Sequence, residues 1–131
     1  MYTLEPKLKA FGYPKTEKLK KKKHIGLLFS EGKSVSMYPL RLVFVPIIDT
    51  EEPFQVGVSV SKRYFKKATD RNYIKRLMRE AYRLNKNILP PNLKQSYAIM
   101  FLYQSKDKPI FVDIQEKMIL VMEKFSAEIS D

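Results

Sequence analysis

The sequence contains no cysteine and no tryptophan, and His24 is its only histidine. The absence of cysteine excludes a disulfide scaffold, a thiolate zinc site and a thiol nucleophile, and a single histidine excludes a histidine-rich metal centre. No apolar run approaches the roughly 20 residues that a membrane-spanning helix needs. Residues 1–6 also lack the apolar core of a secretory signal. We therefore expect a soluble protein of a reducing compartment.

Positive charge is what the sequence has in excess. It carries 25 Lys and Arg against 14 Asp and Glu, a net charge of +11 in 131 residues, a length suited to one domain. The basic residues are concentrated in 1–48 and 62–94, whereas 49–61 and 95–131 are net acidic. Basic charge gathered into two segments predicts a polyanionic partner, most simply a nucleic acid.

Hydrophobic periodicity predicts three helices and three strands, in the order helix, strand, strand, helix, strand, helix. The predicted elements are a helix over 16–30, strands over 40–48 and 54–61, a helix from 71 that ends before Pro90, a strand over 97–103 and a helix over 111–128. Residues 1–15 contain prolines and lysines without periodicity and predict an extended basic arm. Residues 16–131 are then a single α+β domain.

Three local features of the first half have two interpretations each. The strand over 54–61 has one face of small and polar residues, which either receives a ligand or is simply solvated. The acids of 49–53 are metal ligands or, as we favour, part of an exposed hairpin loop. The lysine run 20–23 is a solvated face or, because it opposes the macrodipole at a helix N-terminus, a site for an external anion. Pro46 predicts an edge position or a bulge for the strand over 40–48.

The helix that follows residue 70 carries the strongest signal. At 100° per residue its cations share one face, with Asn72 and Tyr82 among them; they are Arg71, Lys75, Arg76, Arg79, Arg83 and Lys86. The opposite face is apolar. Arginine forks suit bidentate contacts to phosphate, and like charges on one face otherwise repel. We favour nucleic-acid binding over a solvated amphipathic helix or a membrane-surface helix.

Two consecutive motifs resemble the bacterial ribonuclease P protein component. They are Ser59-Val60-Ser61-Lys62-Arg63 and Arg71-Asn72-Tyr73-Ile74-Lys75-Arg76-Leu77-Met78-Arg79-Glu80. The family has a strand ending in Val-Ser-Lys-Lys and a signature helix with the pattern Arg-Asn-Arg-x-Lys-Arg-x-x-Arg-Glu. Tyr73 departs from the third signature arginine, and Ile25 and Val43 stand where the family often has aromatic residues.

The resemblance implies an α-β sandwich with the signature helix in a left-handed crossover, against the general rule. It also implies a cytoplasmic subunit that binds a catalytic RNA and the 5′ leader of precursor tRNA, as a monomer in the holoenzyme and without a membrane partner. The subunit assists cleavage that produces the mature tRNA 5′ end. The Mg²⁺ that this cleavage requires is held mainly by RNA, so neither a catalytic residue nor a metal ligand is expected in the protein.

The resemblance also implies site residues. Contacts to the catalytic RNA are expected from Lys62, Arg63, Arg71, Asn72, Lys75, Arg76, Arg79 and Arg83. A leader cleft is expected to be lined by Phe29, Phe44, Ser59, Ser61, Tyr73 and Tyr82, with an accessory basic patch of Lys20, Lys21, Lys22 and Lys23. Because of the aromatic departures, stacking on the leader is expected to be weaker or to move to Tyr38, Phe44 or Tyr82.

The alternative is a ribosomal-type or chaperone-like RNA-binding protein without nuclease activity. A protein-only nuclease ranks third, because Asp49, Glu51 and Glu52 lie in a turn and form no acid–base constellation with other residues of the sequence. A duplex-DNA binder that uses the same basic helix ranks fourth.

Overall fold

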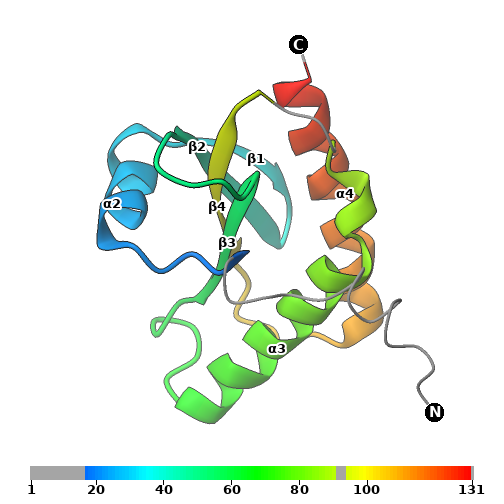
Figure 1. The fold of residues 1–131 in the computed structure, drawn as a ribbon. Helices are drawn as coiled ribbons and strands as arrows, with labels where there is room; N and C mark the ends of the chain where they lie inside the picture. The colour runs from blue at the N-terminus through cyan, green and yellow to red at the C-terminus, as the bar shows by residue number, and fades with distance from the viewer. Residues whose placement is uncertain (1–16, 91–93, 131) are drawn as a thin grey trace, which may run out of the picture.

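A computed structural model of the chain describes residues 17–90 and 94–130. The predicted basic arm, 1–15, lies outside the described residues. Helices cover both faces of one sheet, α2 on one side and α3 with α4 on the other (Figure 1). In chain order the elements are α2 (Lys22–Glu31), β1 (Lys33–Met37), β2 (Leu40–Ile47), β3 (Phe54–Val60), α3 (Ala68–Leu84), a short 3-10 helix η2 (Lys86–Ile88), β4 (Ser96–Tyr103) and α4 (Phe111–Ile129).

The sheet is mixed, with the strand order β1-β2-β4-β3. β2 pairs antiparallel with β1 and with β4, whereas β3 and β4 are parallel and are joined through α3. The α+β class is therefore confirmed, with β4 central and buried as predicted. The segment 49–53 is not the predicted hairpin loop, because β2 and β3 are not neighbours and the chain must pass β4 to connect them.

β1 is a strand that the sequence analysis missed. Its side chains are mostly exposed, and only Val35 and Met37 are half-buried, so its apolar alternation is too weak to mark a strand. β1 forms because Lys33–Met37 pairs residue by residue with Leu40–Phe44 across a tight turn. Pro46 lies just beyond the last of these pairs, where β2 has only β4 as a partner. The missing N–H of Pro46 therefore costs no hydrogen bond to β1, as at an edge strand.

Two helices begin at other residues than predicted, and neither N-cap side chain forms a capping hydrogen bond. α2 begins at Lys22 rather than Thr16, with Lys21 at the N-cap. Before it, Lys18 forms a parallel bridge with Val56, and Leu19 N–H donates to the Val56 carbonyl at the edge of β3. α3 begins at Ala68 rather than at residue 71, with Lys67 at the N-cap.

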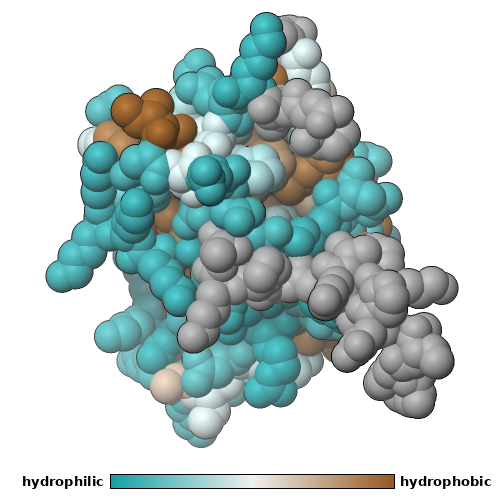
Figure 2. Space-filling model, in the orientation of Figure 1, coloured by the Kyte–Doolittle hydropathy of each residue, from teal (hydrophilic) through white to brown (hydrophobic). Residues whose placement is uncertain are grey.

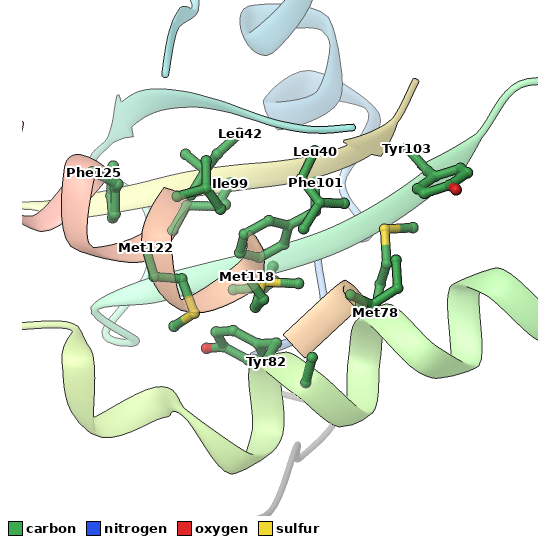
Figure 3. Packing of buried hydrophobic residues seen from close by; sticks show 14 of the residues in the cluster. Leu40, Leu42, Met78, Tyr82, Ile99, Phe101, Tyr103, Met118, Met122 and Phe125 are labelled. Atoms are coloured by element: carbon green, nitrogen blue, oxygen red, sulfur yellow. The ribbon is translucent and has the colours of Figure 1, made fainter. Parts of the chain in front are cut away.

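The sheet separates two hydrophobic cores of unequal size. The large core lies between the sheet and the pair α3 and α4, where Tyr82, Phe101, Met118 and Phe125 are almost fully buried (Figure 3). The small core lies under α2; its buried members are Leu28, Val45, Ile47 and Ala98. Because α2 covers only this small core, part of that sheet face stays open.

Candidate nucleic-acid interface

α3 presents a buried arc to the large core and a polar arc to solvent. The buried residues are Ile74, Met78, Ala81 and Tyr82. Asn72, Arg76 and Arg79 are exposed, and Lys75 is half-buried. Hydrophilic side chains dominate the side of the molecule that Figure 2 shows around α3. The predicted division of the helix into two faces is thus confirmed, but the buried arc is rotated toward Tyr82 and away from Leu84, which is 38% exposed.

The exposed cations of α3 continue into the loop that precedes it. Lys62 and Arg63 are both exposed in this loop. In the described part of the chain none of Lys62, Arg63, Lys75, Arg76 and Arg79 forms a salt bridge. We call these five cations, with Asn72, the signature face. Their charge is uncompensated within the described protein, and this is the arrangement that attracts phosphate.

Two predicted contact residues have partners inside the protein. Arg83 pairs with Glu80 at 2.6 Å, and this hydrogen bond raises the pKa of the Arg83 guanidinium above its ordinary value. Arg71 Nη1 donates to the carbonyl oxygens of Phe65 at 2.8 Å and Lys66 at 2.9 Å. Arg71 therefore holds the loop that carries Lys62 and Arg63 against the start of α3.

A cleft lies beside α3 on the open part of the sheet. It has a volume of about 400 Å³ and receives residues from the extended segment before α2, from α2, β3, α3 and β4. Its lining residues are Lys18, Leu19, Lys20, Ile25, Val56, Gly57, Val58, Arg79 and Met100. Arg79 therefore belongs both to the signature face and to the cleft. Phe29, one helical turn after Ile25, is 75% exposed.

Three residues that we expected in the cleft lie elsewhere. Phe44 points into the large core with Leu40 and Leu42, because alternate residues of β2 face α4, and its ring packs on Phe125 at 4.9 Å. Tyr82 points from α3 into the same core (Figure 3). Tyr73 is half-buried against that core, and its hydroxyl donates to the Pro109 carbonyl at 3.2 Å. The prediction that these rings line the cleft is therefore wrong.

Ser59 and Ser61, which we also expected in the cleft, lie on the open sheet face but outside the cleft lining, and they line a neighbouring hollow. β3 directs Val56 and Val60 toward the large core, so the alternate positions Gly57 and Ser59 face the side of α2. A Cβ at Gly57 would lie 3.4 Å from the Leu19 side chain and 3.5 Å from Met100 Sδ. Because glycine has no side chain, no atoms of residue 57 project into the cleft and reduce its depth.

The four lysines of the run 20–23 have different surroundings: two face Asp49, one lines the cleft and one is exposed to solvent. Asp49 Oδ2 lies 3.4 Å from Lys21 Nζ and 3.5 Å from Lys23 Nζ, and Asp49 Oδ1 lies 2.6 Å from His24 Nε2. The hydrogen bond with His24 holds the pKa of the Asp49 carboxyl well below its usual range. The Asp49 carboxylate therefore supplies a negative charge at the start of α2. Lys20 lines the cleft, and Lys22 is exposed.

Two polar residues of this region were not singled out from the sequence. His24 is 1% exposed and anchors α2 through Asp49. Arg41 lies on the open sheet face, in register with Ser36 on β1 and Leu102 on β4, and it has no salt bridge among the described residues. The signal for Arg41 was a single cation inside an otherwise apolar strand.

Residues 17–90 and 94–130 hold no group of three or more His, Asp or Glu side chains that is placed to bind a metal ion. Nor does any helix within this part of the chain have the length and apolarity that a membrane span requires. Exposed cations beside a partly apolar cleft are an arrangement that can bind phosphates.

Comparison with known proteins gives a consistent result. The family Ribonuclease P matches residues 13–126. The ribonuclease P protein component of Porphyromonas gingivalis is 40% identical over 112 residues, 82% of each chain, and that of Clostridium botulinum is 36% identical over 113 residues, 84% of this chain and 95% of the relative. The RNase P protein from Thermotoga maritima aligns with a TM-score of 0.66 at 25% identity, over 82% of this chain and 96% of that one. This chain belongs to the ribonuclease P protein component family.

Proposed function

We propose that this chain is the RNA-binding subunit of a cytoplasmic ribonuclease P and acts in maturation of the tRNA 5′ end. The signature face binds the catalytic RNA, and the cleft receives the single-stranded 5′ leader of precursor tRNA. One observation carries the proposal: Arg79 belongs to the signature face and also lines the cleft. A single helix can therefore contact two RNA segments that approach each other.

The protein's contribution is electrostatic and positional. Exposed Arg and Lys side chains replace counterions on the phosphates of both RNAs, which reduces the repulsion between the catalytic RNA and the leader. Arg71 keeps the loop of Lys62 and Arg63 in place through its bonds to Phe65 and Lys66. Lys20 extends the positive charge to the opposite side of the cleft.

Cleavage itself is assigned to the catalytic RNA, with Mg²⁺ held mainly by that RNA and one copy of the protein per complex. The signature face consists of cations and one amide, and none of these groups is a general base at neutral pH. The protein raises the affinity for substrate and lowers the Mg²⁺ concentration that the complex needs.

Reconstitution tests this proposal. The purified chain, its cognate RNA and the two together are incubated with precursor tRNA over a range of Mg²⁺ concentrations. We expect no cleavage by the chain alone, and faster cleavage by the mixture than by the RNA alone at low Mg²⁺. Cleavage by the chain free of RNA, or no stimulation of the RNA at any Mg²⁺ concentration, would overturn the proposal; the second result would favour a ribosomal-type or chaperone-like RNA binder.

A further inference from the structure

A second hollow lies at the C-terminal ends of β3 and β4, outside the cleft already described. It has a volume of about 460 Å³. Its lining residues are Tyr38, Ser59, Ser61, Arg63, Tyr64, Leu102, Tyr103 and Gln104. Tyr38 and Tyr64 are its two exposed tyrosines, and of these only Tyr38 was expected from the sequence to stack on the leader.

Tyr38 and Tyr64 reach this hollow from different segments. Tyr38 follows β1 and is 71% exposed, whereas Tyr64 lies in the loop between β3 and α3 and is 45% exposed. Within residues 17–90 and 94–130 neither ring stacks on another aromatic ring, and neither hydroxyl forms a hydrogen bond. Two unstacked rings at one hollow provide flat apolar surfaces for a planar ligand.

The remaining lining supplies polar groups and positive charge. The Ser61 hydroxyl accepts a hydrogen bond from the Arg63 backbone N–H at 3.0 Å, and Gln104 is exposed with an amide that can both donate and accept. Arg63 lines the hollow, and Arg41 is the direct neighbour of Leu102 in the sheet register. Neither guanidinium forms a salt bridge in the described part of the chain. Rings, hydrogen-bonding groups and unpaired guanidinium groups together match a nucleotide with its base and phosphate.

The hollow continues the cleft along the same sheet face. Gly57 and Met100 line the cleft, while Ser59 and Leu102 line the hollow. Each pair lies side by side in the β3–β4 register, and the second pair is two residues further along, about 7 Å. A single strand that occupies the cleft can therefore extend directly into the hollow.

Among the described residues, none that lines the cleft is aromatic. Its apolar lining consists of aliphatic residues and Met100, and Phe44, Tyr73 and Tyr82 are directed into or against the large core. Among residues 17–90 and 94–130, the exposed aromatic surface on the open side of the sheet is thus concentrated at Tyr38 and Tyr64, with Phe29 on α2.

We propose that the hollow between Tyr38 and Tyr64 is a subsite for one unpaired leader base, which stacks on the tyrosine rings while Arg41 and Arg63 neutralise the adjoining phosphates. This proposal rests on the proposed function, because it assumes that the cleft holds the leader. It adds that base stacking takes place at the end of β3 and β4 rather than in the centre of the cleft.

The test combines leader chemistry with tyrosine substitutions in the reconstituted holoenzyme. Precursor tRNAs carry a single abasic nucleotide at successive leader positions, and their affinity is measured with the wild-type protein and with the double variant Tyr38→Leu/Tyr64→Leu. With the wild type, we expect an abasic nucleotide at one position to weaken binding about fivefold or more. With the double variant, the same abasic nucleotide should have no further effect, because the stacking partner is already gone.

Matched controls separate stacking from folding. Tyr38→Phe/Tyr64→Phe keeps both rings and should bind like the wild type. Val112→Ala removes an exposed apolar side chain from α4, on the other side of the sheet, and should change nothing. A 2-aminopurine at the sensitive leader position should be quenched in complexes with wild-type and Phe variants and bright with the Leu variant. Equal affinity of the double variant and the wild type for the catalytic RNA shows that the variant is folded.

An abasic effect that is equal in the wild type and in the double variant would overturn the subsite. In that case the wild-type complex would still prefer long leaders, and the proposed function would stand. If the wild-type complex shows no dependence on leader length at all, the leader cleft itself is refuted and the subsite with it.

Discussion

His24 Nε2 lies 2.6 Å from Asp49 Oδ1, and this contact fastens the start of α2 to the segment that follows β2. His24 is buried, whereas Asp49 is partly exposed and also faces the ammonium groups of Lys21 and Lys23. The contact ties a helix that forms one side of the cleft to the connection that passes β4. We therefore expect it to affect both stability and the shape of the cleft.

The first prediction concerns pH. The pKa of Asp49 is lowered by folding, mainly by the His24 hydrogen bond, so the ionised carboxylate stabilises the folded state above the pKa of the unfolded chain. This stabilisation should decline as the pH falls below about 4, the ordinary value for aspartate. Melting temperatures of the wild type and of Asp49→Asn should therefore differ at pH 7 and converge toward pH 2.

Glu51→Gln is the matched control for this prediction. Glu51 is an exposed acid two residues further on, without a salt bridge among the described residues. Its substitution should leave the melting temperature unchanged across the same pH range. A constant difference between Asp49→Asn and the wild type from pH 7 to pH 2 would contradict the assigned role of the carboxylate.

The second prediction compares two arginines of α3. Arg76 is exposed and has no salt bridge to any residue that the structure describes, whereas Arg83 is paired with Glu80. Arg76→Ala should weaken binding to the catalytic RNA and reduce the slope of log affinity against log salt by about one unit. Arg83→Ala should have a smaller effect, because its charge is already compensated. Filter binding at several salt concentrations measures both slopes, and an unchanged slope for Arg76→Ala argues against the signature face.

The third prediction concerns the floor of the cleft at Gly57. The Cβ of Gly57→Ala fits at 3.4 Å from Leu19, but the branched side chain of Gly57→Val must project into the cleft. Gly57→Val should therefore lower the affinity of the holoenzyme for precursor tRNA about fivefold or more. Binding of mature tRNA and of the catalytic RNA should stay the same. A loss that Gly57→Ala reproduces in full would point to the backbone of β3 rather than to the cleft.

The fourth prediction concerns stability at Gly26. This glycine lies inside α2, and apart from its chain neighbours and the backbone of its own helix no described atom lies within 4 Å of the position that a Cβ would take. Gly26→Ala should stabilise the protein by about 0.5–1 kcal/mol, because alanine loses less backbone freedom in a helix. Denaturant unfolding measures the change. Destabilisation would mean that the helix has a different conformation at this position.

Strongly patterned elements of this fold were predictable from sequence. β4 is apolar throughout and α4 has its apolar residues at helical spacing, and both were placed within one residue of their ends. β1 was missed because its stability comes from pairing with β2, which local periodicity does not contain. The start of α2 was misplaced because Lys21 provides no side-chain cap, and the usual N-cap signal is therefore absent.

The candidate site was less predictable than the fold, because a side chain's direction depends on neighbouring elements. The periodicity of 100° per residue placed Tyr82 beside the cations, but α3 packs against α4, and in the structure Tyr82 is buried whereas Leu84 is partly exposed. Phe44 was expected to line the cleft, yet the alternation of side chains along β2 directs its ring toward Phe125. Arg41 is not part of a recognisable motif, and its position on the open sheet face follows only from its pairing with Ser36 and Leu102.

The helices on the two sides of the cleft, α2 and α3, pack on different hydrophobic cores, so their local stabilities should differ. α3 is packed on the large core, whereas α2 is held by the four buried side chains of the small core and by His24. Regions with few buried contacts open at a lower free energy than the whole molecule. Amide hydrogens of α2 should then exchange with solvent sooner than those of α3. One side of the cleft can move away while the arginine-bearing helix stays fixed, which provides a route for a strand to enter or leave without global unfolding.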